Sequence, residues 1–335
     1  MTNNLERWVG KLAIVSGASS GIGKAISIQL VKAGINVLGT ARREERLINV
    51  SEQLLNEKGK FYPFASDFSK EEDILNAFKW AEDNIGPVHI LINNAGVRRN
   101  TNLISGDTEL WKNIIDTNVM GLCIATREAL RIMNKNNIDG HIIHMNSLSG
   151  HKIVYNSQSS VYPASKFAVT ALTETLRQEL NSIGSKIKIT SISPGWVDTN
   201  FRRDSNLETF DHLPALESED VADSVMYVLG TPPHVQIAKA KTRKRNKRES
   251  ISSSSSEEES ITPIIMDSDN TDEFLDTLLE AEVEEEEDAN DNDNNKENLN
   301  STGSMKVSVG SWILGKYYTK QIYQTLRGTC IRTYG

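Results

Sequence analysis

The stretch LAIVSGASSGIGKAISIQL, residues 12–30, joins a short apolar run to a helical pattern through a glycine-rich turn. LAIVS predicts a buried strand, and the residues from Lys24 onward predict a helix. The glycines between them allow the backbone to approach a pyrophosphate closely, and the helix N-terminus supplies unpaired N–H groups. Tight turns need glycine in any case, so it is the position between strand and helix that favours a phosphate site.

Similar apolar runs rich in Val and Ile recur along the first 238 residues. They are INVLGT at 35–40, FYPFAS at 61–66, VHILINN at 88–94, HIIHMNS at 141–147 and IKITSIS at 187–193. Helical patterns lie between them, as at 162–183, and we expect a last helix at about 218–230 and a last strand from His234. Alternating strands and helices predict an α/β fold with a doubly wound, Rossmann-like parallel sheet.

The chain changes character after Ala238. Residues 1–238 carry a net charge of −2, from 24 Lys and Arg against 26 Asp and Glu, while the remainder carries −6 of the total of −8. Runs such as SSSSS at 252–256 and EEEED at 284–288 cannot bury apolar surface, which predicts disorder. We therefore expect a catalytic domain at 1–238, a disordered tail at 239–305, and strand-forming character again at 306–335. A fused gene is one explanation of this tail.

The charged run AKAKTRKRNKRES begins at Ala238, and its alternation is poor for a strand. Its basic residues at 239–248 suit nuclear import or nucleic-acid contact, and the alternative is a solvated linker. The N-terminus lacks the apolar run of a targeting signal, and no stretch approaches the ~20 apolar residues of a membrane helix. With only two cysteines, the sequence predicts a reduced, cytoplasmic protein without a membrane span.

The spacing G-x-x-x-G-x-G, preceded by Ser16, resembles the turn of the classical short-chain dehydrogenase/reductase family. The resemblance covers about residues 8–238, and further family motifs follow in order: NNAG at 93–96, YPASK at 162–166 and SPGWVDT at 193–199. It implies a nicotinamide dinucleotide and no metal. The cofactor contacts it implies are Gly17, Ser19, Ser20, Gly21, Ile22, Gly23, Asp67, Phe68, Asn93, Ala95, Gly96, Tyr162, Lys166, Pro194, Gly195, Val197 and Thr199.

Two of these motifs keep a plain structural alternative. NNAG also suits a simple turn after a strand, and Asp67 also suits the start of the next helix. The choice of cofactor is read at the end of the second strand, where a carboxylate suits NAD and a cation suits NADP. Ala41 holds that position, and Arg42 and Arg43 follow, which favours NADP(H) as the cofactor. The alternative is that the arginine is a solvated charge at the start of a helix, paired with Glu44 or Glu45.

Tyr162 and Lys166 are four residues apart, which places both on one face of a helix. A nearby ammonium is expected to lower the tyrosine pKa from about 10, making Tyr162 a general acid/base. That spacing alone is common, but Ser147 ends the preceding strand and suits a hydrogen bond to the substrate oxygen. The resemblance adds Asn118 as a fourth catalytic position and Trp196 at the substrate side.

Other stretches, such as NSLSGHK and YVLGTPPHVQI, resemble a branch of the family that includes the insect farnesol dehydrogenases. That implies a lipid-type alcohol or carbonyl substrate, such as an isoprenoid, a steroid or a small carbonyl. The pocket lid at 200–216 is short, and the helices at 107–134 and 160–183 are the family's usual faces for a homodimer or homotetramer. The alternative function is a catalytically idle NADP-binding scaffold that acts through its charged tail.

Overall fold

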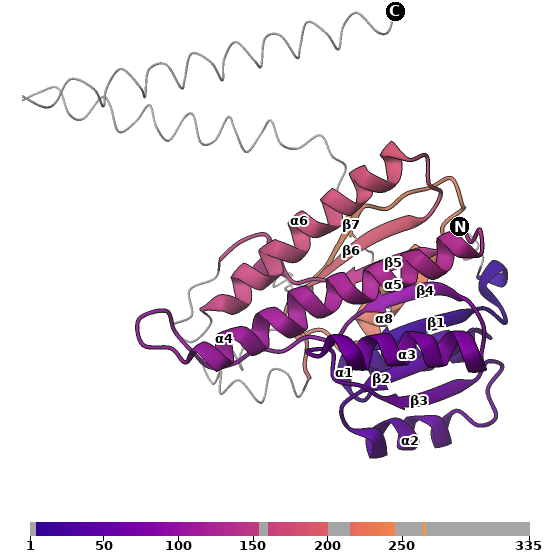
Figure 1. Ribbon diagram of the computed structural model, residues 1–335, viewed down its shortest axis with the longest axis horizontal. Helices are drawn as coiled ribbons and strands as arrows, with labels where there is room; N and C mark the ends of the chain where they lie inside the picture. The colour runs from indigo at the N-terminus through magenta and orange to yellow at the C-terminus, as the bar shows by residue number, and fades with distance from the viewer. Residues whose placement is uncertain (1–4, 154–159, 200–214, 245–263, 266–335) are drawn as a thin grey trace, which may run out of the picture. The chain divides into compact units, whose positions relative to one another are not determined.

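A computed structural model describes residues 5–153, 160–199, 215–244 and 264–265 (Figure 1). The predicted lid up to residue 214 and the tail from residue 245, apart from Ile264–Ile265, lie outside the described residues. The strand-forming segment predicted at 306–335 therefore lies outside them too.

One sheet has the strand order β3-β2-β1-β4-β5-β6-β7-β8. The first seven strands are parallel, and β8 pairs antiparallel with β7. The order reverses between β1 and β4, and in such sheets ligands bind beyond the carboxyl ends of the strands at this reversal. The strands are β1 Leu12–Ser16, β2 Asn36–Ala41, β3 Phe61–Ala65, β4 Val88–Asn93, β5 His141–Met145, β6 Lys188–Pro194, β7 Lys239–Thr242 and β8 Ile264–Ile265.

Helices cover both faces of the sheet (Figure 1). One apolar core lies between the sheet and α1, α2 and α8, and the other lies between the sheet and α3, α5 and α6. The predicted doubly wound fold is confirmed. The helices are α1 Gly21–Lys32, α2 Glu44–Gln53, α3 Glu71–Asn84, α4 Thr108–Ile115, α5 Gly121–Lys135, α6 Val161–Ser182 and α8 Ser218–Leu229, with short helical turns at Glu6–Trp8, Asp116–Met120 and Leu148–Gly150.

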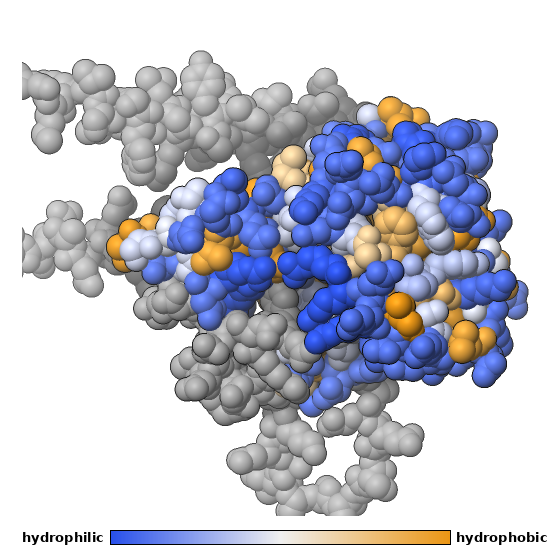
Figure 2. All heavy atoms as spheres, turned by 60° about the horizontal axis from the view of Figure 1, so that its bottom comes forward, coloured by the Kyte–Doolittle hydropathy of each residue, from blue (hydrophilic) through white to orange (hydrophobic). Residues whose placement is uncertain are grey.

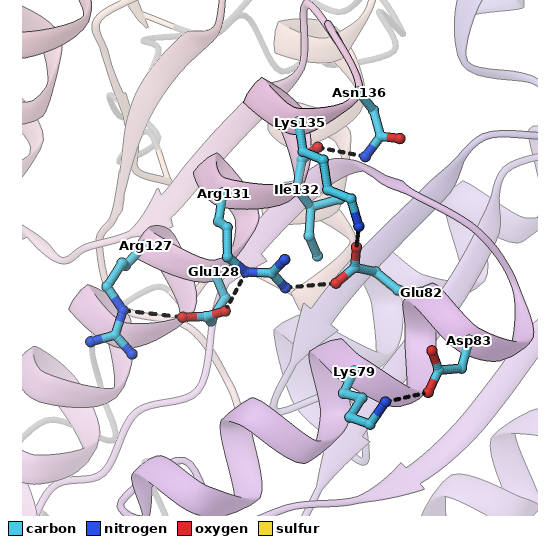
Figure 3. Close-up of polar contacts among 9 residues, drawn as sticks. All are labelled: Lys79, Glu82, Asp83, Arg127, Glu128, Arg131, Ile132, Lys135 and Asn136. Atoms are coloured by element: carbon cyan, nitrogen blue, oxygen red, sulfur yellow. Dashed lines mark hydrogen bonds and ion pairs between the residues drawn. The ribbon is translucent and has the colours of Figure 1, made fainter.

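The outer helices α3 and α5 are joined by ion pairs (Figure 3). Arg131 lies 2.6 Å from Glu82 and 2.9 Å from Glu128, and Lys135 lies 3.5 Å from Glu82. Partly exposed pairs of this kind contribute about 1 kcal/mol or less each, so the apolar cores stabilise the fold far more.

The surface is mostly hydrophilic on the face shown in Figure 2, where apolar residues lie in small, separate groups. Within the described residues, no helix is both long enough and apolar enough to cross a membrane.

The last parallel strand is not where the sequence predicted it. A strand was expected from His234, but β7 begins at Lys239, beyond the predicted domain boundary, and takes up the start of the basic run. Ala240 and Thr242 are buried, while Lys239 is exposed. Buried and exposed side chains therefore alternate, as in a strand, but the buried ones are small and not strongly apolar, so the sequence resembles a polar segment. The interpretation of residues 239–242 as a solvated linker is wrong.

Strand β7 also supports the edge of the sheet where the predicted site lies. The N–H of Gly195 donates to the carbonyl of Thr242 at 2.7 Å, and the Thr242 hydroxyl lies 2.9 Å from the hydroxyl of Ser224 in α8. The Pro-Gly turn after β6 thus depends on a strand that the sequence placed outside the domain.

We predict that a chain ending at residue 238 is less stable than one ending at residue 244. The shorter chain loses β7 and leaves buried backbone groups of β6 unpaired, at about 1–3 kcal/mol each. A loss of that size lowers the melting temperature by several degrees in a domain of this length. Thermal unfolding followed by circular dichroism compares the two chains, and equal melting temperatures would show that β7 does not support the sheet.

Candidate functional site

The glycine-rich turn has the geometry of a phosphate cradle. Gly17 and Gly21 have φ values of +71° and +54°, which favour glycine. A Cβ on Gly23 would lie 2.3 Å from the carbonyl oxygen of Gly17, so only glycine allows this close packing of turn and helix. Ser20 starts α1 without a side-chain cap, which leaves N–H groups of the first helical turn for a ligand.

The turn is tied to the end of β4 by a side chain whose role the sequence did not reveal. The Ser16 hydroxyl accepts hydrogen bonds from the N–H groups of Asn94 at 3.0 Å and Ala95 at 2.9 Å. In return, the Asn94 side-chain amide donates to the carbonyl of Ser16 at 2.9 Å. The NNAG motif is therefore bonded to the end of β1 beside the glycine-rich turn, and is not only a turn after a strand.

Asn93 was predicted to contact the cofactor, but it does not line the cleft. Its amide nitrogen donates to the hydroxyl of Thr126 in α5 at 2.9 Å, and its side chain is buried. Alternation along β4 explains this, because successive side chains point to opposite faces of the sheet. Asn94, which was not predicted, lines the cleft instead.

The ends of β2 and β3 form the far end of the cleft. Ala41, Arg42 and Arg43 line it, and both arginines are exposed. Asp67 and Phe68 also line it. The Asp67 carboxylate accepts hydrogen bonds from the N–H and the hydroxyl of Ser69, at 3.0 and 2.8 Å. One of its two oxygens is therefore already bonded within this turn. The structure therefore brings two cations, Arg42 and Arg43, and the aromatic residue Phe68 to the same end of the cleft.

Ser147, Tyr162 and Lys166 converge at the opposite end. Ser147 follows β5 and its hydroxyl caps the turn Leu148–Gly150, accepting from the N–H of Ser149 at 3.1 Å. Tyr162 and Lys166 lie in the first turns of α6 and are 9% and 7% exposed. The Lys166 ammonium donates to the carbonyl of Met145 at 2.9 Å and lies 5.9 Å from the centre of the Tyr162 ring.

The pKa of Tyr162 differs from the sequence expectation. Burial raises it above the usual value, and a hydrogen bond with Ser147 and the charge of Arg98 oppose this rise. Lys166 is itself buried, and this desolvation lowers its pKa to about 8. The sequence predicted that the ammonium lowers the tyrosine pKa, but it gives no measure of how strongly the site excludes water. In the structure, burial outweighs the hydrogen bond of Ser147 and the charge of Arg98.

Asn118 does not line the cleft, but it connects two of its walls. It lies in the π-helical turn Asp116–Met120 that separates α4 from α5. Its side-chain oxygen accepts from the N–H of Val97 at 2.8 Å, and its amide donates to the Val97 carbonyl at 2.9 Å and to the hydroxyl of Ser165 at 3.0 Å. Ser165 in turn donates to the carbonyl of Tyr162 at 2.7 Å. Asn118 therefore holds the segment after β4 against the start of α6.

The segment after β6 closes the cleft. Trp196 accepts a backbone hydrogen bond from Leu216 at 2.7 Å, and Gly195 is held by β7 as described above. The predicted residues of this segment that line the cleft are Pro194, Gly195, Trp196, Val197 and Thr199.

The cleft has a volume of about 520 Å³, and its lining includes the glycine turn, the ends of β2 and β3, and Trp196. All predicted site residues except Asn93 and Asn118 line it. Glycines in place of side chains at one end, and a Ser, Tyr and Lys cluster at the other, suit a dinucleotide and a second, smaller molecule. The sequence missed two cations in its lining, Arg98 and Lys152. Only one feature of the sequence indicates that Arg98 lies in the cleft, namely its position directly after NNAG-V.

Comparisons with known proteins agree with this geometry. The family model described as short chain dehydrogenase matches residues 11–209. The farnesol dehydrogenase of Aedes aegypti is 50% identical over 235 residues, which cover 70% of this chain and 95% of the relative. Dehydrogenase/reductase SDR family member 11 of Homo sapiens is 43% identical over 249 residues, covering 71% and 96%.

Solved structures show the same fold. A short-chain type dehydrogenase/reductase from Mycobacterium marinum is 27% identical with a TM-score of 0.64, and the match covers 70% of this chain and 94% of that one. A metagenomic short-chain oxidoreductase, solved in complex with NADP, is 26% identical with a TM-score of 0.61, over 72% of this chain and 99% of that one. Matching motifs, fold and relatives lead to one conclusion: the chain belongs to the short-chain dehydrogenase/reductase family of oxidoreductases.

Proposed function

We propose that the protein is an NADP-dependent oxidoreductase that interconverts an alcohol and its aldehyde or ketone. The observation that carries this proposal is the convergence of Ser147, Tyr162 and Lys166 at one end of a cleft that also contains a glycine cradle. When bound, the cofactor would accept or supply the hydride. The protein's own side chains then need to orient the substrate oxygen and move one proton.

Each of the three side chains has a distinct part in this proposal. The Ser147 hydroxyl donates a hydrogen bond to the substrate oxygen and positions it. The Tyr162 hydroxyl gives a proton to that oxygen during carbonyl reduction, and the Tyr162 phenolate takes a proton from it during alcohol oxidation. Lys166, fixed to the carbonyl of Met145, favours the phenolate of Tyr162 by its charge.

Asn118 has a positioning part in the same scheme. Its hydrogen bonds to Val97 and Ser165 hold the start of α6, and with it Tyr162, at the cleft. We place it outside the set of groups that touch the substrate, because its side-chain oxygen and nitrogen are both bonded within the protein.

We propose a lipid-type substrate, with an isoprenoid such as farnesol as the first choice and a steroid or a small carbonyl as others. The similarity to a farnesol dehydrogenase of Aedes aegypti supports this class. Apolar side chains near Ser147 and Tyr162, among them Val97, Leu148 and Trp196, also suit it.

We propose NADP(H) as the cofactor. Ala41 stands where an acidic residue would bind the ribose 2′-hydroxyl, and Arg42 and Arg43 follow it at the rim of the cleft. A relative solved with NADP supports the choice. The guanidinium of Arg42 suits a bidentate contact with a 2′-phosphate.

Oligomeric state and location belong to the same proposal. Met120 and Phe167 are large apolar residues on the helical segments before α5 and in α6, and they are 49% and 41% exposed. Burying them against a second copy would remove apolar surface from water. We therefore propose a cytoplasmic homodimer or homotetramer.

Tyr162→Phe is predicted to abolish turnover while NADPH binding stays nearly unchanged. The phenyl ring still packs, but the group that exchanges the proton is gone. The matched control is Tyr227→Phe in α8, because Tyr227 does not line the cleft. Nicotinamide absorbance measures turnover and cofactor fluorescence measures binding. Activity of Tyr162→Phe within a few-fold of wild type would remove Tyr162 from the mechanism.

Arg42→Ala is predicted to weaken NADP(H) binding and to change NAD(H) binding little. Loss of a charge-assisted hydrogen bond costs about 1.5–3 kcal/mol, which is roughly ten- to a hundred-fold in affinity. Arg46→Ala is the control, because Arg46 is an exposed cation of α2 that does not line the cleft. Titrations with both cofactors give the ratio of the two affinities. Equal losses of affinity for NADP(H) and NAD(H) would mean that Arg42 does not contact the phosphate.

The oligomer is tested by light scattering on the full chain. The predicted mass is two or four times the 37.3 kDa of one chain. Replacing Phe167 by Glu should lower it, and a wild-type mass of one chain would contradict the proposal.

A further inference from the structure

A second cation faces Tyr162 besides the lysine of α6. Arg98 lies in the segment that follows β4, is half-buried and lines the cleft. Its guanidinium carbon is 5.9 Å from the centre of the Tyr162 ring, the same distance as the ammonium nitrogen of Lys166. The two cations come from different elements and approach the same tyrosine.

The position of Arg98 is fixed by the structure around it. Its neighbour Val97 is held through both backbone groups by Asn118, which also bonds Ser165. Because Ser165 donates to the carbonyl of Tyr162, the same small network holds the segment carrying Arg98 and the helical turn carrying Tyr162. The buried contacts therefore hold the backbone that carries Arg98 close to the helical turn that carries Tyr162.

The charged groups around Tyr162 are predominantly cationic among the described residues. Lys166 faces it from α6, Arg98 from the segment after β4, and Lys152 lines the cleft on the segment after β5. Residues 195–199, which follow β6, contribute Trp196 and Thr199 to the lining, whereas Asp198 of the same segment does not line the cleft. Asp67 is the only acidic residue in the described lining, and its carboxylate bonds Ser69 after β3.

The two close cations differ in how firmly they keep their charge. Burial lowers the pKa of Lys166 to about 8, so its ammonium begins to lose its proton in mildly alkaline solution. Burial also lowers the pKa of Arg98, but a guanidinium starts from a far higher pKa than an ammonium, and Tyr162 opposes the change. An arginine thus stays charged where the lysine does not.

We propose that Arg98 stabilises the phenolate of Tyr162 electrostatically, together with Lys166, and so extends proton exchange at Tyr162 to lower pH. The expected effect on alcohol oxidation rests on the proposed function, whereas the expected effect on the pKa of Tyr162 does not. Arg98 acts through Tyr162 and is a positioning residue in this scheme.

The sign and size of the effect follow from electrostatics. Burial raises the pKa of Tyr162 and the charge of Arg98 lowers it, so removing the charge must raise the pKa further. For unit charges about 6 Å apart, Coulomb's law gives a change of roughly one to two pH units at an effective dielectric constant of about 40 to 20. Alcohol oxidation needs the phenolate, so its acid limb should move to higher pH by the same amount.

The direct test is a titration of Tyr162 by phenolate absorbance in the full-length protein. Subtracting the curve of Tyr162→Phe isolates this tyrosine from the other seven of the chain's 8. Arg98→Met should raise the apparent pKa by roughly one to two units, and Arg98→Lys should retain most of the wild-type value. Arg98→Gln replaces the methionine variant if that variant does not fold.

Arg99→Met is the matched control. It removes a positive charge from the next residue, which does not line the cleft and is not among the groups that shift the pKa of Tyr162. Its curve should coincide with wild type. An unchanged pKa in Arg98→Met, or an equal rise in Arg99→Met, would overturn the proposal.

The kinetic arm separates this inference from the proposed function. In the pH profile of kcat/KM for farnesol oxidation, the acid limb of Arg98→Met should shift upward while Arg98→Lys restores it. An absence of turnover in every variant would reject the proposed function, and the absorbance titration would still decide the role of Arg98. A higher KM in Arg98→Met with an unmoved limb would show that Arg98 binds the substrate instead, and would overturn the proposal.

Discussion

The hydroxyl of Ser16 accepts hydrogen bonds from the N–H groups of Asn94 and Ala95, and the rest of the site depends on this contact. It joins the end of β1 to the end of β4 at the point where the strand order reverses. With the two ends held together, Gly17 and Gly23 can pack so closely that no Cβ fits between turn and helix. A concave surface lined by backbone results, and the helix N-terminus that borders it suits an anion.

A second constraint acts at the other end of the cleft, where Asn118 holds Val97 and Ser165. This arrangement holds Tyr162 and Lys166 with little exposure to water. Desolvation opposes the charged form of both groups, which is unfavourable for proton exchange near neutral pH. The charge of Arg98 and the Ser147 hydrogen bond offset part of that desolvation cost for the phenolate, and bound substrate and cofactor would complete the site.

Much of this structure could be predicted from the sequence, and the failures have physical reasons. Strands rich in Val and Ile were found to within one or two residues, because a parallel sheet buries both of its faces. Strand β7 was misplaced because Ala240 and Thr242 are small and alternate with lysines, which hides the pattern. Asn94 and Arg98 were missed because their partners, Ser16 and Tyr162, are far away in the sequence. The burial that raises the pKa of Tyr162 could not be predicted, because it is a property of the folded chain.

The most direct test of this account is a scan of alcohols, including farnesol, with the purified full-length protein and either NADP⁺ or NAD⁺. The account predicts that nicotinamide absorbance will rise with at least one alcohol, and that kcat/KM will be about ten-fold or more higher with NADP⁺, the low end of the effect of one charged contact. Tight binding of NADP⁺ without turnover of any alcohol would contradict it, and would favour a protein that keeps the fold of an oxidoreductase as a binding scaffold.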